Sequence, residues 1–216
     1  MKRCRWKIKI PSLWTLHSRR ALARNTSANF EGIKITHQVM QHTHYKEFVR
    51  ITCEALQLIQ DYSPRHFQRI KRHVRFISYE RLISGGQWNG VTATCAIDFS
   101  YFYPEFTSAQ VAGDSSYDSY LTYYAGVLIH EATHARLKSL DFPYTKKTYR
   151  RIEHICETEE RRFWWAVYEF TEDEKQESLQ KIDLEGSDQF FHLSLWERIQ
   201  KAREIIKGLN REESAE

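Results

Sequence analysis

Residues 130–134 read His-Glu-Ala-Thr-His, and their types and spacing suit the binding of one metal ion. Positions four apart on a helix lie one turn apart on the same face, so the imidazoles of His130 and His134 can bind the same ion. Glu131 lies about 100° around the helix, where its carboxylate can reach a water on the ion instead of the ion itself. Two imidazole ligands beside a general base are the arrangement expected of a hydrolytic zinc site.

Three acidic residues stand on the apolar face of the next expected helix, which runs from about residue 145 to residue 170. At about 100° per residue, Glu153, Glu157 and Glu160 all fall on that face. Unpaired carboxylates buried there would cost several kcal/mol each, so a cation must meet them. A zinc site of the hydrolytic kind needs a third protein ligand, and we expect one of these carboxylates to supply it.

Eighteen residues separate His134 from Glu153, which gives the pattern HExxH-x18-E. The pattern resembles the gluzincin metallopeptidases, in which two histidines and a downstream glutamate on a second helix bind zinc. The resemblance covers about residues 130–160. It implies that His130, His134 and Glu153 bind one zinc ion per chain and that Glu131 activates the attacking water. It also implies that the substrate is a peptide or a protein.

Two questions about this site stay open at the level of the sequence. Glu157 stands where some gluzincins keep a carboxylate that orients a ligating histidine. In the alternative register Glu157 is the third ligand, and Glu153 or Glu160 lies behind the histidines; we favour Glu153 as the ligand. A donor for the oxyanion is also needed, and the sequence does not distinguish among Tyr123, Tyr144, Tyr149 and Tyr168.

Other zincin signatures are missing from the chain. It has no Gly-x-Met-x-Asn motif of the aminopeptidases and no third histidine at the metzincin spacing. Its two methionines, Met1 and Met40, both precede the motif and exclude a downstream Met-turn. We therefore expect an α+β fold that is a minimal zincin-like core: a small, mostly antiparallel sheet, the HExxH helix and a downstream ligand helix, with helical additions at both ends.

Hydrophobic periodicity places the other elements. Apolar positions recur at helical spacing over 43–62, Ser63-Pro64 begins a second helix that ends near residue 73, and a long helix covers about 117–139. Residues 75–83 are β-rich, Gly85-Gly86 suggests a turn, and 104–116 reads as a loop. Residues 91–100 alternate with period two, which predicts an antiparallel or edge strand. The resemblance implies that such a strand binds extended substrate, and an ordinary sheet strand is the equal alternative.

The composition divides the chain into three expected parts: a basic arm over 1–42, the zincin-like domain over 43–170, and an acidic and helical extension over 171–216. The formal net charge of +4 conceals an asymmetry. Residues 1–75 hold 16 Lys and Arg against 4 Asp and Glu, and residues 76–216 hold 16 against 24. The basic region could contact nucleic acid, but no nucleic-acid-binding motif accompanies it, so we do not favour that partner.

Cysteine spacing and hydropathy indicate the cellular compartment in which we expect the protein. The four cysteines are widely separated and form no CxxC pair, which suits a reducing cytoplasm. No apolar run is long enough to span a membrane. The main hypothesis is therefore a cytoplasmic zinc metallopeptidase. The alternatives are a non-catalytic or regulatory zincin-like module whose basic arm docks nucleic acid or a partner, and a purely structural zinc site. The oligomeric state is open.

Overall fold

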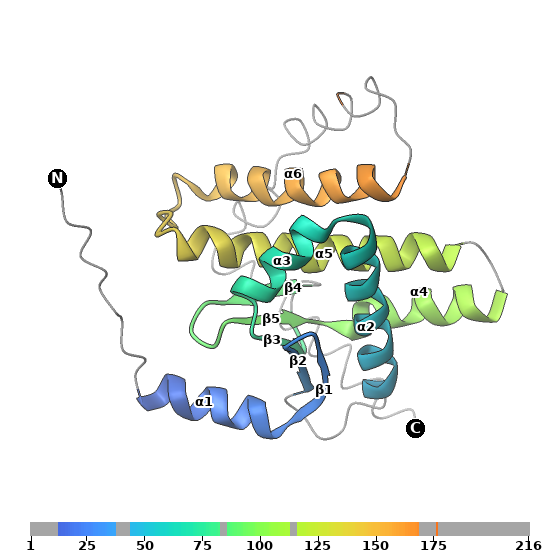
Figure 1. The fold of residues 1–216 in the computed structure, drawn as a ribbon, viewed down its shortest axis with the longest axis horizontal. Helices are drawn as coiled ribbons and strands as arrows, with labels where there is room; N and C mark the ends of the chain where they lie inside the picture. The colour runs from blue at the N-terminus through green and yellow to red at the C-terminus, as the bar shows by residue number, and fades with distance from the viewer. Residues whose placement is uncertain (1–12, 38–43, 83–85, 113–115, 169–175, 177–216) are drawn as a thin grey trace, which may run out of the picture.

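The computed structural model describes residues 13–37, 44–82, 86–112, 116–168 and 176. Within these residues the chain forms six helices and one five-stranded mixed sheet (Figure 1). The expected α+β class is therefore confirmed. The expected acidic and helical extension over 171–216, apart from residue 176, and residues 1–12 and 38–42 of the expected basic arm lie outside the described residues.

The sheet has the strand order β1-β2-β3-β5-β4. The three inner strands, β2, β3 and β5, run parallel to one another, and the two outer strands are antiparallel to their neighbours. The expectation of a mostly antiparallel sheet is therefore wrong. Helices α2 (Tyr45–Tyr62) and α3 (Pro64–His73) connect β2 to the parallel β3, and β4 lies between β3 and β5 in the chain but pairs antiparallel with β5 at the sheet end, which leaves β5 parallel to β3. The bounds are β1 Thr26–Phe30, β2 Ile33–His37, β3 Phe76–Tyr79, β4 Gly86–Asn89 and β5 Thr94–Ile97.

The edge strand before the HExxH helix is β4 and not the 91–100 segment. Thr94–Ile97 forms β5, which lies between β3 and β4 and is buried at all four positions. Its alternation is misleading, because its Thr and Ala side chains are small enough to be buried; Thr94 Oγ1 donates a 2.7 Å hydrogen bond to Thr92 Oγ1. Gly86, expected in a turn, begins β4, whose residues alternate between half-buried and exposed.

Four of the six helices were expected from periodicity. They are α2 (Tyr45–Tyr62), α3 (Pro64–His73), α5 (Ser116–Ser139) and α6 (Tyr149–Val167). Ser63 separates α2 from α3: its backbone N–H closes the last turn of α2 on the carbonyl of Ile59, and Pro64 opens α3. Proline suits the first helical position because its missing N–H would have no intrahelical partner there.

The fourth helix in the chain, α4 (Phe99–Ala112), replaces the loop expected over 104–116. Pro104 lies inside it and removes one backbone hydrogen bond. Burial of Phe99, Phe102 and Phe106 outweighs that loss. Asp98 precedes the helix, and its carboxylate accepts hydrogen bonds from the backbone N–H groups of Ser100 and Leu82, an N-terminal signal that sequence reading missed.

Residues 13–37 are part of the same fold. Leu13–Arg24 forms α1, which contacts β2, and residues 26–37 supply two strands of the sheet. Ile33 and Ile35 of β2 are fully buried in the main core. Residues 26–37 therefore belong to the sheet and α1 packs beside it, so residues 13–37 do not form an arm separate from the rest of the fold.

Helix α5 lies at the centre of the molecule. It packs against α2, α3, α4 and α6 and against β4 and β5 (Figure 1). Aromatic side chains fill the space around it: Tyr124 of α5 is fully buried, packs edge-to-face on Phe99, and shares a 2.9 Å hydroxyl–hydroxyl hydrogen bond with Thr52 of α2. No helix among the described residues is long and apolar enough to cross a membrane.

A buried ionic cluster joins α3 to α6. Glu159 of α6 accepts hydrogen bonds from Arg69 and from His66 Nε2, the latter at 2.9 Å. His66 Nδ1 in turn lies 2.7 Å from the Ser63 hydroxyl, and Arg162 pairs with the second oxygen of Glu159 at 2.8 Å. The hydrogen bonds from His66 and Arg69 outweigh burial and lower the pKa of Glu159 to about 2.

Replacing Glu159 with Gln should therefore destabilise the protein in a pH-dependent way. Its folded-state pKa lies below the ordinary value of 4.5, so the carboxylate stabilises the fold above pH 4.5 and this contribution is lost as pH falls towards 2. We expect a loss of about 2–3 kcal/mol at pH 7, measured by urea unfolding at several pH values.

The matched control is Glu47→Gln, which removes a half-exposed carboxylate of α2 paired with Arg50. It should change the free energy of unfolding by less than about 1 kcal/mol. The assigned role of the Glu159 carboxylate would be contradicted if the free energies of unfolding of the wild type and of Glu159→Gln differed by the same amount at pH 7 and at pH 3.

Candidate metal centre

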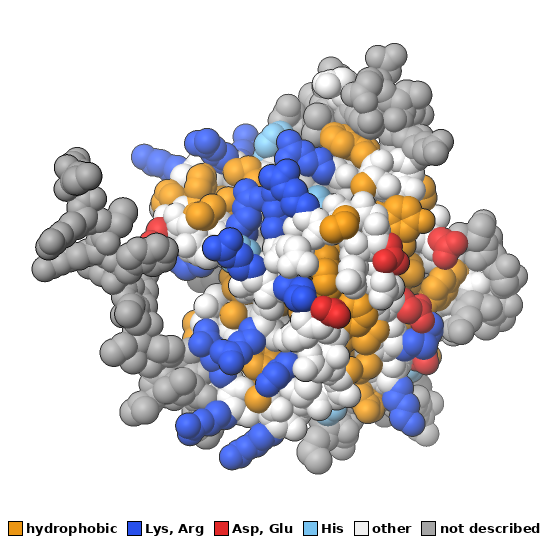
Figure 2. All heavy atoms as spheres, in the orientation of Figure 1, with side chains coloured by type: hydrophobic (Ala, Val, Ile, Leu, Met, Phe, Trp, Pro, Cys, Tyr) orange, Lys and Arg blue, Asp and Glu red, His pale blue; other side chains and the backbone are white. Residues whose placement is uncertain are grey.

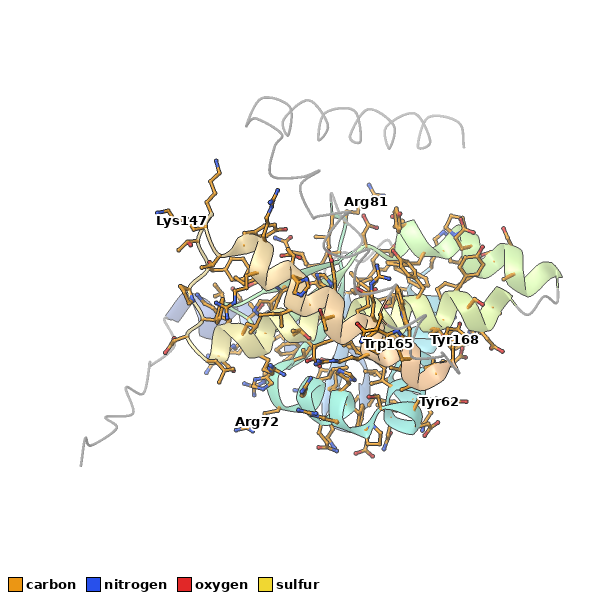
Figure 3. The ribbon with its side chains drawn as sticks, turned by 90° about the horizontal axis from the view of Figure 1, so that it is seen from above. Tyr62, Arg72, Arg81, Lys147, Trp165 and Tyr168 are labelled. Carbon is orange, nitrogen blue, oxygen red and sulfur yellow. The ribbon has the colours of Figure 1, made fainter. Side chains whose placement is uncertain are left out.

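Helices α5 and α6 lie side by side, and the candidate residues meet between them. Figure 3 shows α6 lying along α5, with Lys147 in the preceding loop and Trp165 and Tyr168 at its C-terminal end. The loop is short, and the backbone N–H groups of Leu140 and Phe142 close the end of α5 on its last carbonyls. A short connection makes the helices antiparallel neighbours, and this brings the HExxH turn opposite the start of α6.

The carboxylate of Glu153 faces both histidines of the motif. His130 Nε2 lies 3.2 Å from Glu153 Oε2, and His134 Nε2 lies 3.6 Å from Glu153 Oε1. Glu153 and His134 are buried, and His130 is 18% exposed. The structure thus places against the two imidazoles the same carboxylate that the sequence favoured as third ligand.

These separations suit a small cation. Zinc ligands at 2.0–2.1 Å in a tetrahedral arrangement lie about 3.3 Å from one another. The two Nε2–carboxylate distances, 3.2 and 3.6 Å, lie on either side of that value. Two nitrogens and a carboxylate are also donors that zinc accepts readily. The residues present therefore fit a zinc ion held by His130, His134 and Glu153.

The other ring nitrogen of each histidine is held from behind. His130 Nδ1 lies 3.3 Å from Glu160 Oε2, and His134 Nδ1 lies 2.9 Å from the hydroxyl of Tyr144. An ionised carboxylate only accepts hydrogen bonds, so Glu160 selects the tautomer with the proton on Nδ1 and leaves the Nε2 lone pair of His130 for a metal. Tyr144 can accept from His134 in the same way.

The position of Glu160 depends on a close approach at Gly126. A Cβ on Gly126 of α5 would lie 2.7 Å from Nε1 of Trp164 and 3.1 Å from the Glu160 side chain. The absence of a Cβ at this position therefore leaves room for the Trp164 and Glu160 side chains against α5. The absence of a side chain at Gly126 helps to place Glu160 within reach of His130.

Glu131 points away from α6 and towards the sheet edge. It is 6% exposed, and a Cβ on Gly86 of β4 would lie 3.0 Å from its Oε1. The backbone of β4 therefore passes directly beside this carboxylate. Burial raises the pKa of Glu131, and the neighbouring His130 and His134 only partly oppose the rise. A carboxylate with a raised pKa beside an ion is suited to accept and return a proton.

The centre favours positive charge. Burial tends to raise the pKa of Glu153, but the hydrogen bonds from His130 and His134 outweigh it and lower this pKa to about 2. Burial tends to lower the pKa of His130, yet Glu153 and Glu160 together raise it well above its usual value. The carboxylates thus stabilise a cation at the imidazoles, and a bound metal ion satisfies the same demand as a proton.

Cys156 is a further ligand candidate. His130, His134 and Cys156 each offer a ligand atom within 4.8 Å of the others. However, the Cys156 Sγ lies 3.5 Å from Nδ1 of His134, whereas Glu153 faces Nε2 of the same ring. An ion shared by both Nε2 atoms would therefore face Glu153, with the thiol behind His134. Burial, with the nearby carboxylates, raises the pKa of this thiol.

The remaining candidates are placed less centrally. Glu157 is half-buried, and burial raises its pKa; the carboxylate that contacts a histidine from behind is Glu160, so the orienting role expected of Glu157 belongs to Glu160. Of the four tyrosines, Tyr144 contacts His134 and Tyr149 hydrogen-bonds Glu153. Tyr123 packs against Phe102 and Trp164, and Tyr168 follows the end of α6.

Comparison with known proteins identifies no relative. The chain matches no protein-family model, and neither the curated proteins nor the solved structures compared with it give a match. What can be said of the function therefore depends on the geometry of this centre.

Metal analysis of three variants should identify the ligands. We expect about one zinc ion per wild-type chain, and loss of this ion in His134→Ala and Glu153→Gln, because each removes a donor atom. Cys156→Ser should keep the metal. Plasma mass spectrometry of the purified proteins gives the stoichiometry, and circular dichroism shows whether each variant is folded. A folded Cys156→Ser protein without zinc would assign the thiol as a ligand instead.

Glu160→Gln should weaken zinc binding without abolishing it. The amide can still contact His130 Nδ1 but no longer carries the charge that makes the imidazole a stronger ligand. We expect the zinc dissociation constant to rise about 10–100-fold, measured by competition with a chromophoric chelator. Glu157→Gln serves as the control on the same helix, and an equal loss of affinity in both variants would contradict the role of Glu160.

Proposed function

We propose that this protein is a zinc-dependent metallopeptidase whose ion is held by His130, His134 and Glu153. The observation that carries the proposal is the position of the Glu153 carboxylate between the two Nε2 atoms while Glu160 and Tyr144 hold the opposite ring nitrogens. The set leaves a further coordination position for water or substrate, as a catalytic zinc site requires.

Zinc in such a site acidifies a water and polarises the carbonyl of the bond to be cleaved. Glu131 is the residue that takes the proton from the attacking water, because its carboxylate is buried beside the two imidazoles and makes no part of the ligand set. It then returns the proton to the leaving amine. Tyr144 lies behind His134 at Nδ1 and Tyr149 donates a hydrogen bond to Glu153, so either hydroxyl would have to leave its present partner to donate to the oxyanion.

The substrate would lie along β4. Among the described strands β4 pairs with β5 alone and stands at the end of the sheet order, so an extended peptide can add to its outer edge. Gly86 places this strand directly beside Glu131. A peptide bond held by β4 is therefore brought to the carboxylate that acts on the water.

The order of elements supports a minimal zincin-like core. An antiparallel edge strand, the helix that carries His-Glu-Ala-Thr-His and a second helix that carries Glu153 follow one another in the chain and surround the candidate centre. The gluzincin resemblance of the sequence implies the same order. The mixed sheet with three parallel strands is a feature that the motif alone does not predict.

A structural zinc site is the second candidate, and the buried thiol of Cys156 is the observation that favours it. The thiol and the two imidazoles offer ligand atoms within 4.8 Å of one another, so a closed structural site would hold the ion with Cys156 instead of an open coordination position. A closed site would bind zinc and hydrolyse nothing. The two candidates therefore differ in activity and in the effect of Cys156→Ser on metal content.

Glu131→Gln should separate binding from catalysis. The amide keeps the shape of the side chain but accepts no proton at neutral pH, so zinc should stay at about one per chain while peptide hydrolysis falls at least about 100-fold. Cleavage of a mixed peptide library, followed by mass spectrometry, provides the assay. Asp61→Asn makes the same chemical change on the exposed end of α2 and should leave hydrolysis unchanged.

Two results would overturn the proposal. One is a zinc-loaded wild-type protein that cleaves no member of the library; the other is a Glu131→Gln variant that cleaves as fast as the wild type.

A further inference from the structure

A second feature of α5 is a pocket that it forms with α4. The pocket has a volume of about 440 Å³, within the range of small-ligand sites. Its walls are almost entirely aromatic, and its one charged side chain is Glu105. The residues that line it are Tyr101, Phe102, Glu105 and Phe106 from α4 and Tyr120 and Tyr123 from α5.

The parts of α4 and α5 that line the pocket contribute no Lys or Arg. No Lys or Arg occurs in the sequence between Arg81 and Arg136, although the whole chain contains 32 of them. That stretch includes all of β4, β5 and α4 and the part of α5 that reaches the HExxH motif. On the face shown in Figure 2, most Lys and Arg side chains lie on the left and in the centre, and most Asp and Glu side chains lie to the right of the centre.

The pocket lies on the same side of α5 as the metal centre. Tyr123 precedes His130 by seven positions, which returns it to the same helix face about 10 Å away. Trp164 of α6 packs at 6.4 Å from the Tyr123 ring, next to Glu160, the residue that contacts His130. The two sites are thus joined by a continuous row of side chains along α5 and α6.

We propose that this pocket binds a cationic side chain, Lys or Arg, of the peptide substrate, two to four residues from the bond that is cleaved. The proposal rests on the proposed peptidase function and adds its substrate class. The distance follows from the helix rise. Tyr123 and Tyr120 lie about 10 and 15 Å along α5 from His130, an extended peptide covers about 3.3 Å per residue, and the long stem of Lys or Arg spans part of the separation.

The chemistry of the walls selects a cation over an apolar group. Ammonium and guanidinium groups are attracted to the faces of aromatic rings, and a carboxylate at the rim adds a direct charge interaction. The aliphatic stem of Lys or Arg also packs well on aromatic surface. An acidic side chain would meet Glu105 without a compensating cation in the lining, so acidic residues should be rejected at this position.

The first test uses matched peptides derived from a bond that the wild-type enzyme cleaves in the mixed library. The residue two, three or four positions from that bond, on either side, is made Arg, norleucine or Glu in turn. We expect kcat/KM at one of these positions to be about tenfold higher for Arg than for norleucine, and lowest for Glu. Equal values for Arg and norleucine at every position would overturn the proposal.

Glu105→Gln tests the pocket itself. It should reduce the Arg-to-norleucine ratio at that position to about 2 or less while cleavage of the norleucine peptide is unchanged, and raising the salt concentration should reduce the wild-type ratio in the same direction. Asp61→Asn, which removes a carboxylate outside the pocket, should keep the ratio. A ratio that Glu105→Gln leaves unchanged assigns the preference to another surface and overturns the proposal.

A binding experiment separates this inference from the proposed function. The Glu131→Gln protein is titrated with the Arg and norleucine peptides, and binding is followed by calorimetry, which needs no turnover. If the wild-type protein cleaves nothing, an Arg peptide taken from a basic member of the library replaces the cleaved sequence. Tighter binding of Arg that depends on Glu105 supports the pocket even then, and equal binding of the two peptides overturns it.

Discussion

The negative charge enclosed between α5 and α6 is the constraint on which the centre depends. Glu131, Glu153 and Glu160 are largely buried around two imidazoles that are neutral when they act as metal ligands. Carboxylates in such a place are unstable unless a cation joins them. A proton on His130 is one such cation, because Glu153 and Glu160 raise the pKa of this imidazole above its usual value. A divalent ion supplies twice that charge at the same point, so metal binding and the stability of this helix pair are coupled.

The rest of the fold holds α6 at a fixed distance from α5. On one side Glu153 and Glu160 meet the histidines of α5, and on the other Glu159 is held by the His66 and Arg69 side chains of α3. One helix is thus fixed by two ionic contacts on different faces. The absence of a side chain at Gly126 of α5 leaves room for the Glu160 and Trp164 side chains of α6. Donor atoms on a helix fixed in this way keep their geometry better than donor atoms on a loop would, and a metal site needs such precision.

Sequence reasoning located the parts of the site that depend on local spacing. His130, Glu131 and His134 share a helical turn, and the position of Glu153 on an apolar face already indicated a buried partner. Tyr144 could not be singled out, because it reaches His134 from a loop whose path is decided by the packing of two helices. The edge position of β4 was missed for a related reason. Strand order depends on long-range pairing, so the local sequence does not say which of two short neighbouring strands, β4 or β5, lies at the edge of the sheet. Helix α4 depends on the burial of its phenylalanines, which overrides the proline and the turn-like composition.

The charge asymmetry of the chain acquires a different meaning in three dimensions. Along the sequence it separates a basic first third from an acidic remainder, but the segment that matters is the stretch from 82 to 135, which has no Lys or Arg. It contains the edge strand, the aromatic pocket and Glu131. By contrast, several arginines lie close together around α3, and their mutual repulsion tends to lower the pKa of Arg69 and of His73; these arginines are Arg65, Arg69 and Arg72 of α3 and Arg136 of α5. Under the proposed function, a basic peptide would be repelled by these arginines and attracted to the surface that leads to the centre. The stretch from 82 to 135 holds Asp and Glu but no Lys or Arg, which is the charge distribution that the proposed preference for a cationic side chain requires.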